Sequence, residues 1–502
     1  MGRRRGASGR DGHRVLTDLP LSLAGAAAQA AAIAAGEVSA VELFDAVIDR
    51  FERFNPALNA VVVERIDEAR ARAVEADHET ATGGSWGALH GVPITIKEAW
   101  LWDGTPSTSG YEAMRGHVAD RNDESVQRLL DAGAVIYGKT NLPVGMADWQ
   151  TFNPIYGTTG NPWDPDLVPG GSSGGSAVAV ATGMAGLELG SDIGASIRNP
   201  AHYCGVFGHK PTYGLVPIDG HGAPGDPRTL DIGVGGPIAR TAADLSLGLD
   251  VVAGAGGLDA RGWRLELPEP RFERPDRVRA AVMLESPVVE QDAELAAQLT
   301  ATVEALGELG VELDWDARPA IDQRRSHEVY TALLRAATGT ETSPDDIEEW
   351  RAHGERFRDG DTDYLAKMGH GISLSHWEWA AFDRERKHMQ AAWDGFFDEY
   401  DLLLCPTAAS VAYPHDHTGI RATRTITVNG HEVPTVDQLF WAGFSCGVLL
   451  PGTVAPAGLT ASGLPCGLQI VAGHLRDRES LAFAAFMEAE LGGALIAPGY
   501  ES

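Results

Sequence analysis

The chain has 502 residues, of which 44% are hydrophobic and 22% charged, a composition typical of globular proteins with a substantial core. Its 70 acidic residues outnumber its 40 basic residues, so the formal net charge at pH 7 is −30. This charge disfavours binding to nucleic acids and anionic membranes, and it suits a neutral or cationic small-molecule substrate.

The first residues, MGRRRGASGRDGHR, are basic and rich in glycine, and we expect residues 1–17 to form a disordered tail. Together with the alanine-rich LPLSLAGAAAQAAAIAAG that follows, they raise the alternative of an export signal. The alanine-rich part runs into GEVSAVELFDAVIDRF, where Ser39 and Glu42 match a capping box and apolar residues recur at helical spacing. We therefore favour packed structure from residue 18 onward and a cytoplasmic location.

Short segments that suit β-strands alternate with segments of helical periodicity along the rest of the chain. We expect strands at residues 91–97, 133–139, 186–190, 279–284, 311–315, 400–405 and 466–472. We expect helices at residues 39–54, 63–76, 122–132, 173–184, 292–309, 376–399 and 479–491. This alternation predicts an α/β fold in layers around a mixed sheet, with residues 18–502 as a single domain.

The segment GVPITIKEAW places one lysine, Lys97, at the end of an apolar expected strand. A lysine that follows Val92, Ile94 and Ile96 is expected to be partly desolvated, which favours its neutral form. A neutral amine accepts a proton, so Lys97 is a candidate general base.

The run GGSSGGSAVAVATGMAGLELGSDIGASIRNP, residues 170–200, places Ser172, Ser173 and Ser196 in glycine-rich backbone. Glycine allows positive φ and close backbone approach, so amide N–H groups here can face a reacting oxygen. A serine nucleophile, a second serine that relays a proton and a lysine base together predict acyl transfer.

Other interpretations of this run are weaker. The nucleophile elbow of α/β-hydrolases requires a strand directly before the serine, whereas a loop rich in proline and aspartate precedes Ser172. A phosphate-binding loop would carry lysine where Ser176 stands. A flexible linker would not open directly into the apolar, helix-competent segment AVAVATGMAGL.

With these motifs, and with KPTYGLVP, DLLLCPT and GLPCGLQIVAG further along, the chain resembles the amidase signature family of serine hydrolases from about Ser39 onward. The resemblance implies α/β/α layers around a large mixed sheet and hydrolysis of an amide through an acyl-enzyme intermediate. It assigns the nucleophile to Ser196, the bridging serine with a cis peptide bond to Ser172, and the base to Lys97.

The same resemblance implies an oxyanion hole formed by the backbone N–H groups of Ile193, Gly194, Ala195 and Ser196. Many members of the family carry glycine where this chain has Ala195. If that position requires positive φ, alanine costs roughly 1 kcal/mol of strain there.

Supporting residues follow from the sequence and the resemblance together. Ser173 matches a serine that hydrogen-bonds within the lysine network. Asp192 and Arg198 flank Ser196, and we expect them to form a structural ion pair that holds the loop.

The resemblance also implies a substrate pocket. Met146 matches a residue that lines the acyl pocket, although a core position suits a lone methionine equally well. Residues 254–399 are rich in charge and tryptophan, and they correspond to the variable, helical part that covers the active site. Phe440 and Trp441 suggest that the acyl or amine group is apolar or aromatic.

No cofactor and no metal are expected. Four cysteines without a C-x-x-C pair support neither a disulfide framework nor a zinc site. No stretch of apolar residues is long enough to predict a membrane span. The expected partner is a small amide-type substrate, and a homodimer is left open.

Several amide-like substrates remain open. A stand-alone amidase is favoured, and hydrolases of carbamates, aryl amides or nylon-like oligomers belong to the same family. The glutaminase-like subunit of a tRNA-dependent amidotransferase is less favoured because the middle segment lacks its tyrosine-rich stretch. A catalytically dead scaffold is disfavoured because it has no reason to keep a desolvated lysine beside two serines.

Overall fold

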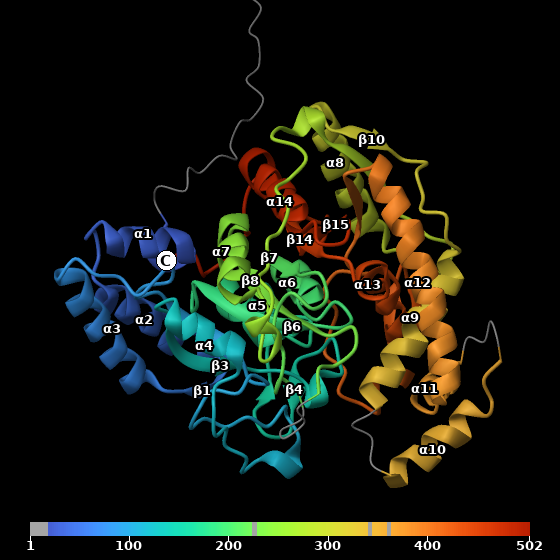
Figure 1. The fold of residues 1–502 in the computed structure, drawn as a ribbon, viewed down its shortest axis with the longest axis horizontal. Coiled ribbons are helices and arrows are strands. Elements are labelled where there is room, and N and C mark those ends of the chain that lie inside the picture. The colour runs from blue at the N-terminus through green and yellow to red at the C-terminus, as the bar shows by residue number, and fades with distance from the viewer. Residues whose placement is uncertain (1–18, 223–227, 340–343, 359–362) are drawn as a thin grey trace, which may run out of the picture.

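The computed structural model describes residues 19–222, 228–339, 344–358 and 363–502. The tail expected at residues 1–17 lies outside these ranges. A mixed, 11-stranded sheet runs through the molecule (Figure 1). In spatial order its strands are β1 (Val61–Glu64), β3 (Val135–Thr140), β2 (Pro93–Lys97), β6 (Leu187–Asp192), β8 (Val234–Ala239), β7 (Phe207–Lys210), β14 (Gly452–Leu459), β15 (Pro465–Ala472), β11 (Leu402–Pro406), β9 (Arg279–Val282) and β10 (Glu312–Asp314).

Two short hairpins lie outside this sheet. They pair β4 (Phe152–Asn153) with β5 (Gly157–Thr158) and β12 (Thr425–Val428) with β13 (His431–Pro434). The 3₁₀ helices are η2 (Leu21–Leu23), η3 (Glu112–Met114), η4 (Val144–Met146), η5 (Asp259–Arg261), η6 (Pro275–Arg277), η8 (Arg421–Thr423) and η9 (Thr435–Gln438).

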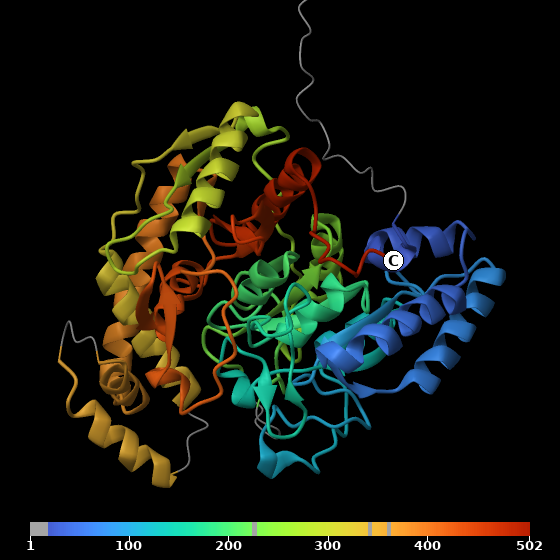
Figure 2. The same ribbon diagram turned by 180° about the vertical axis from the view of Figure 1, so that it is seen from behind.

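Helices cover the sheet on both faces and at its two ends, which gives the expected α/β/α layers (Figures 1 and 2). They are α1 (Ala26–Ala34), α2 (Ala40–Leu58), α3 (Ile66–Ala81), α4 (Glu124–Asp131), α5 (Gly174–Ala181), α6 (Arg198–Cys204), α7 (Ala242–Val252), α8 (Ala293–Glu308), α9 (Gln323–Thr338), α10 (Pro344–Gly354), α11 (Tyr364–Ile372), α12 (His376–Glu399), α13 (Leu439–Cys446) and α14 (Asp477–Leu491).

The direction of the strands determines which edge of the sheet carries the candidate site residues. Strand β2 is parallel to both of its neighbours, β3 and β6. Parallel strands end at the same edge of a sheet. The last residue of β2, Lys97, therefore lies beside the last residues of β6, Ser191 and Asp192.

Local sequence explains the helices that hold this edge. Helix α2 begins at the expected capping box, since Ser39 Oγ accepts from the Glu42 N–H and Glu42 accepts from the Ser39 N–H. Every residue of α5 is buried, and its small and β-branched side chains pack in one apolar cluster with α2. Because small residues allow a helix to lie close to a sheet, α5 packs tightly against its neighbours. It therefore holds residues 170–173, the loop that precedes it, in place.

Residues 254–399 supply helices α8 to α12 together with β9 and β10, which extend one edge of the sheet and fall on the strands expected at 279–284 and 311–315. Figures 1 and 2 both show these helices on the opposite side of the molecule from α1, α2 and α3. One further correction concerns the helix expected from residue 63: residues 63 and 64 pair with β3 as part of β1, and the helix starts at Ile66.

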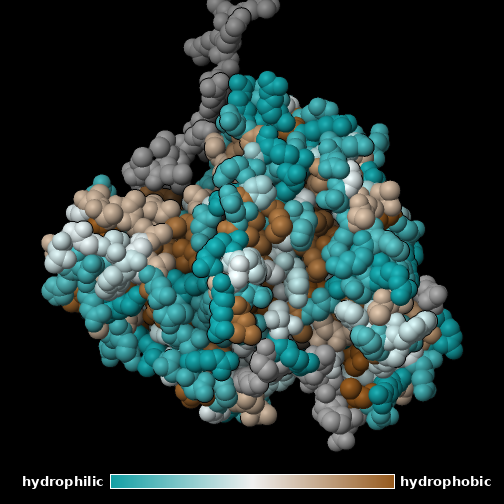
Figure 3. Space-filling view, viewed as in Figure 1, coloured by the Kyte–Doolittle hydropathy of each residue, from teal (hydrophilic) through white to brown (hydrophobic). Residues whose placement is uncertain are grey.

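The surface agrees with the acidic composition. Figure 3 shows a face that is mostly hydrophilic, with apolar residues visible mainly in its central part. Within the ranges that the structure describes, no helix combines the length and the apolar character needed to cross a membrane.

Candidate active site

Lys97 lies at the end of β2 with no exposed surface. Its Nζ donates to Ser172 Oγ at 2.7 Å and to Ser191 Oγ at 2.9 Å. Ser172 comes from the loop before α5, and Ser191 from the end of β6. Three segments that are far apart in the sequence thus meet at one amine.

The environment of Lys97 favours its neutral form. Burial lowers the pKa of Lys97 from its ordinary value of 10.5 to about 7, although the charges of Asp192 and Glu188 oppose this shift. A neutral amine has two N–H bonds and one lone pair. It can therefore donate to Ser191 and accept from Ser172 in the same geometry.

Ser196 lies in the loop between β6 and α6 and shares a cavity with these groups. The cavity has a volume of about 200 Å³, and Ser172, Ser191 and Ser196 all line it. Among the residues that the structure describes, no hydrogen bond joins the hydroxyls of Ser172 and Ser196. Such contacts commonly tighten only when substrate is bound.

The backbone around Ser172 is tightly constrained. The Gly171–Ser172 peptide bond is cis, as the resemblance implies. Gly170 has φ of +83°, and a Cβ there would lie 2.7 Å from Pro200 Cα, so only glycine fits. The Ser173 N–H donates to the Ser196 carbonyl at 3.1 Å, which ties the two serine loops together.

Ser173 acts on the backbone rather than on the amine. Its Oγ donates to the Ser191 carbonyl at 3.3 Å and accepts from the Ser191 N–H at 3.4 Å. The hydroxyl that completes the lysine network is that of Ser191, which was not singled out in the sequence. The parallel register of β2 and β6 would have pointed to it.

Two side chains orient the peptide planes of the loop before Ser196. Tyr330 Oη donates to the Ile193 carbonyl at 2.9 Å. Because a trans peptide is planar with its C=O and N–H opposed, this contact directs the Gly194 N–H the other way. Trp149 Nε1 holds the next carbonyl, that of Gly194, at 2.8 Å.

This geometry corrects the expected oxyanion hole at one position. The Ala195 N–H donates to Asp192 Oδ1 at 2.9 Å, so it is already bonded within the loop. The N–H groups of Ile193, Gly194 and Ser196 make no hydrogen bond to any residue that the structure describes, and all three residues line the cavity. These three groups remain as candidate donors to an oxyanion.

Ala195 has φ of +68°, a left-handed conformation that costs a non-glycine residue about 1–2 kcal/mol. We expect Ala195→Gly to raise the free energy of unfolding by about 0.5–1 kcal/mol, after the greater backbone entropy of glycine is subtracted. Urea unfolding measures the change. As a control, Ala301→Gly at an exposed site in α8 should lower the same free energy by about 1 kcal/mol. Equal destabilisation of both variants would refute the strain at Ala195.

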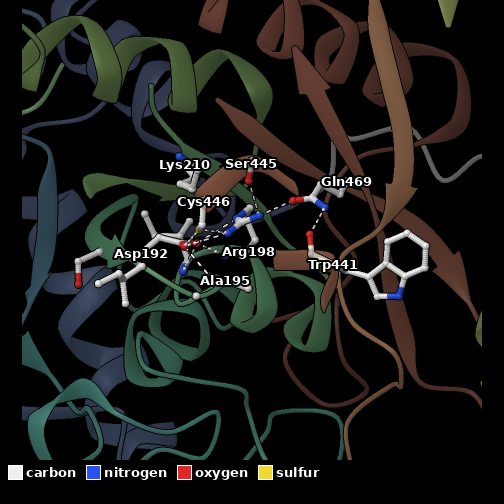
Figure 4. A network of polar contacts seen from close by, with 12 residues as sticks. Asp192, Ala195, Arg198, Lys210, Trp441, Ser445, Cys446 and Gln469 are labelled. Carbon is white, nitrogen blue, oxygen red and sulfur yellow. Dashed lines mark hydrogen bonds and ion pairs between the residues drawn. The ribbon is translucent and has the colours of Figure 1, made fainter. Parts of the chain in front are cut away.

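The expected ion pair between Asp192 and Arg198 anchors this loop (Figure 4). Both side chains are fully buried, with Arg198 Nη2 2.9 Å from Asp192 Oδ1. Burial alone would raise the pKa of Asp192, but the charge and hydrogen bonds of Arg198 lower it to about 2. Arg198 also donates to Ser445 Oγ at 2.7 Å and to Gln469, which connects the loop to α13 and β15. The pair therefore holds the loop in place, although Asp192 also lines the cavity.

The expected pocket residues separate into two groups. Met146 lines the cavity, and its sulfur accepts from Ser191 Oγ at 3.8 Å. Phe440 and Trp441 instead pack in an apolar cluster with Trp393 and Phe444, and Trp441 Nε1 donates to Gln291 Oε1. Neither of these two aromatic residues lines the cavity; their neighbour Leu439 does.

The histidines near the motif are engaged elsewhere. His202 Nδ1 accepts from the Gly467 N–H at 2.7 Å, its Nε2 contacts the Ser410 carbonyl, and burial lowers its pKa to about 4. His209 lies between Thr453 and Asp477. One histidine that was not singled out, His221, does line the cavity.

In the described ranges, no group of three or more His, Cys, Asp or Glu side chains is arranged to hold a metal ion. The polar groups that line the cavity include the hydroxyls of Ser172 and Ser196, and the buried amine of Lys97 contacts Ser172. Hydroxyls and an amine in this arrangement can form and break an acyl ester by proton transfer between oxygen and nitrogen.

The known proteins that this chain is similar to include an indoleacetamide hydrolase and acylamidases. Residues 42–481 match a family model described as Amidase. The chain is 35% identical to an indoleacetamide hydrolase of Bradyrhizobium diazoefficiens, with 92% of this chain and 86% of that protein covered. It is 33% identical to an acylamidase of Rhodococcus erythropolis, with 94% and 97% covered. A solved bacterial aryl acylamidase matches with a TM-score of 0.77 and 27% identity, over 93% of this chain and 96% of that one.

Proposed function

Because this chain belongs to the amidase signature family and is an amide hydrolase, we propose that it cleaves a carboxylic amide through Ser196, Ser172 and Lys97. The observation that carries the proposal is the 2.7 Å contact between Ser172 Oγ and the fully buried Lys97 Nζ, at a cavity that Ser196 also lines. The products are an acid and an amine or ammonia.

Acylation needs a base, a nucleophile and a proton for the leaving group. Neutral Lys97 accepts the Ser172 proton while Ser172 accepts the Ser196 proton. Ser196 Oγ then forms a bond to the carbonyl carbon of the amide. The oxygen of the tetrahedral intermediate accepts from the N–H groups of Ile193, Gly194 and Ser196.

Collapse of the intermediate breaks the C–N bond. Ser172 returns a proton to the departing nitrogen and is itself reprotonated by Lys97, so the amine leaves neutral. Water then attacks the Ser196 ester with Lys97 and Ser172 as base again. The acid is released and Ser196 regains its proton.

A fluorophosphonate probe tests the nucleophile independently of the substrate. This probe phosphonylates activated serine hydroxyls, so we expect it to label the wild-type protein at Ser196. Mass spectrometry of the labelled peptide gives the site. The matched control is Ser173→Ala, which leaves Ser196 in place and should still be labelled. Labelling of Ser196→Ala at the wild-type level would sink the assignment.

We propose a substrate class from the names of the relatives and from the residues that line the cavity. One relative is named an indoleacetamide hydrolase and others are named acylamidases, and apolar side chains such as Met146, Trp149 and Leu439 line the cavity here. Aryl and arylalkyl amides are therefore the first candidates. A panel of these with aliphatic amides, carbamates and amide oligomers ranks the alternatives by kcat/KM.

The proposed setting is a cytoplasmic enzyme that acts on a small molecule. All four cysteines are free and buried, as suits a reducing compartment.

A further inference from the structure

Two guanidinium groups line the same cavity as the serine loops. Arg335 comes from α9, and Arg421 from η8. They belong to segments that are 86 positions apart in the sequence, and the sequence motifs single out neither of them. Their presence contrasts with the net charge of −30 of the whole chain.

Neither guanidinium is neutralised by a carboxylate within the described ranges. Arg335 is 5% exposed and donates to the phenolic oxygen of Tyr364, at 3.1 Å from Nε. Arg421 lies over the ring of Trp149, with 5.0 Å between the guanidinium carbon and the ring centroid. The structure gives the Arg421 side chain no hydrogen bond or ion pair to a described residue.

The carboxylates of the cavity are already committed to other arginines. Asp148 Oδ2 accepts from Arg424 at 2.5 Å, and its Oδ1 accepts from the Trp149 N–H. Asp192 pairs with Arg198. Among the described residues, the two carboxylates that line the cavity thus form ion pairs with Arg424 and Arg198 and not with Arg335 or Arg421.

The two guanidinium groups repel each other. Burial lowers the pKa of Arg421 from its ordinary value and the charge of Arg335 adds to this effect, whereas Tyr364 and Asp148 act in the opposite direction. Holding two like charges beside a cavity is unfavourable unless an anion enters between them. A guanidinium also presents paired N–H donors in a plane, which matches the two oxygens of a carboxylate.

We propose that Arg421, with Arg335 beside it, binds a carboxylate carried by the substrate, so that the preferred substrate is an amide with a second, anionic group. This proposal rests on the proposed amide hydrolysis at Ser196. Apolar side chains including Leu334, Trp149 and Ile193 line the same cavity, and they suit an apolar spacer between the amide and the carboxylate. The acidic composition predicted the opposite preference because it averages over the whole surface.

Matched substrates test the proposal. In one arm, the monoamides of glutaric, adipic and suberic acid are compared with alkanamides in which a methyl group replaces the carboxylate. In the other arm the carboxylate is on the amine side, as N-acyl ω-amino acids compared with N-acyl alkylamines. The measured quantity is the ratio of kcat/KM for the charged substrate to that for its neutral match.

We expect the wild-type ratio to exceed one in one arm, which also shows which side of the amide faces Arg421. Arg421→Gln should lower that ratio by about 10–100-fold, the range for a hydrogen bond to a charged group. Arg421→Lys should keep part of the preference because it keeps the charge without the planar fork. Arg324→Gln, an exposed arginine on α9, is the matched control and should leave the ratio unchanged.

A binding measurement separates this proposal from the proposed function. In Ser196→Ala protein, calorimetry gives the Kd of the preferred charged amide, and adding Arg421→Gln should weaken it by about 10–100-fold. A ratio of one or less in both arms, or a ratio and Kd that Arg421→Gln does not change, would overturn the carboxylate site while leaving amide hydrolysis intact. Absence of all turnover, with no fluorophosphonate labelling of Ser196, would instead overturn the proposed function, and this inference with it.

Discussion

Replacing Ser196 by alanine is expected to lower kcat by about 10⁴–10⁶-fold, the loss typical of removing the nucleophile from a serine hydrolase. In the proposed mechanism, the variant removes the oxygen that attacks the amide carbonyl. It leaves the backbone N–H of this position in place, so substrate binding should survive. Steady-state kinetics on the best substrate of the panel measure the loss.

The fold should tolerate this change. Ser196 is contacted through its carbonyl, which accepts from the Ser173 N–H, and alanine keeps that carbonyl. Urea unfolding should therefore give nearly the wild-type midpoint. Ser191→Ala is the informative comparison, because it removes one partner of Lys97 but leaves nucleophile and relay in place, and it should retain measurable activity. More than trace hydrolysis by pure Ser196→Ala would contradict the proposed nucleophile.

Removal of Lys97 should lower kcat/KM by about 10²–10⁴-fold, the usual contribution of a general base, and should also change the pH profile. Only the neutral amine accepts a proton from Ser172. Burial places the pKa of Lys97 at about 7, so wild-type activity should rise as the pH increases through about 7 and level off above it. Lys97→Ala should lose this limb because the titrating group is gone.

Lys97→Met is the matched variant, since it fills the buried space without an amine. Both variants should show the same flat acidic limb across a pH series of kcat/KM. If either kept the wild-type profile at reduced height, another group would be the base. His202 does not fit that role, because its ring nitrogens contact backbone groups away from the cavity.

Strands with strong local preferences could be predicted from the sequence, and strands decided by their neighbours could not. β2 and β15 are rich in apolar residues, among them Ile94, Ile96 and Ile470, and the sequence located both. β8 reads VGGPIA, with two glycines and a proline. Its form depends on packing, because a Cβ at Gly236 would lie 2.4 Å from the His209 carbonyl oxygen.

The same division holds for the candidate site. Motifs pointed to Lys97, Ser172 and Ser196, because their neighbours in the sequence carry the signal. Tyr330 and Arg421 lie in segments without a motif, and they reach the cavity only through tertiary packing. Phe440 and Trp441 show the opposite case. Their aromatic side chains near a motif predicted a substrate pocket, but in the structure they belong to the buried core.

Helix α9 carries both residues that line the cavity and a residue that orients a candidate oxyanion donor. Leu334, Arg335 and Thr338 on this helix line the cavity, whereas Tyr330, one turn earlier, holds the carbonyl that orients the Gly194 N–H. Under the proposed mechanism, substitutions that change the preferred substrate and substitutions that change the rate would therefore lie on neighbouring turns of the same helix. Residues in the last turn of α9 can therefore vary between related enzymes. Position 330 is more restricted, because its side chain must place a hydroxyl against the Ile193 carbonyl.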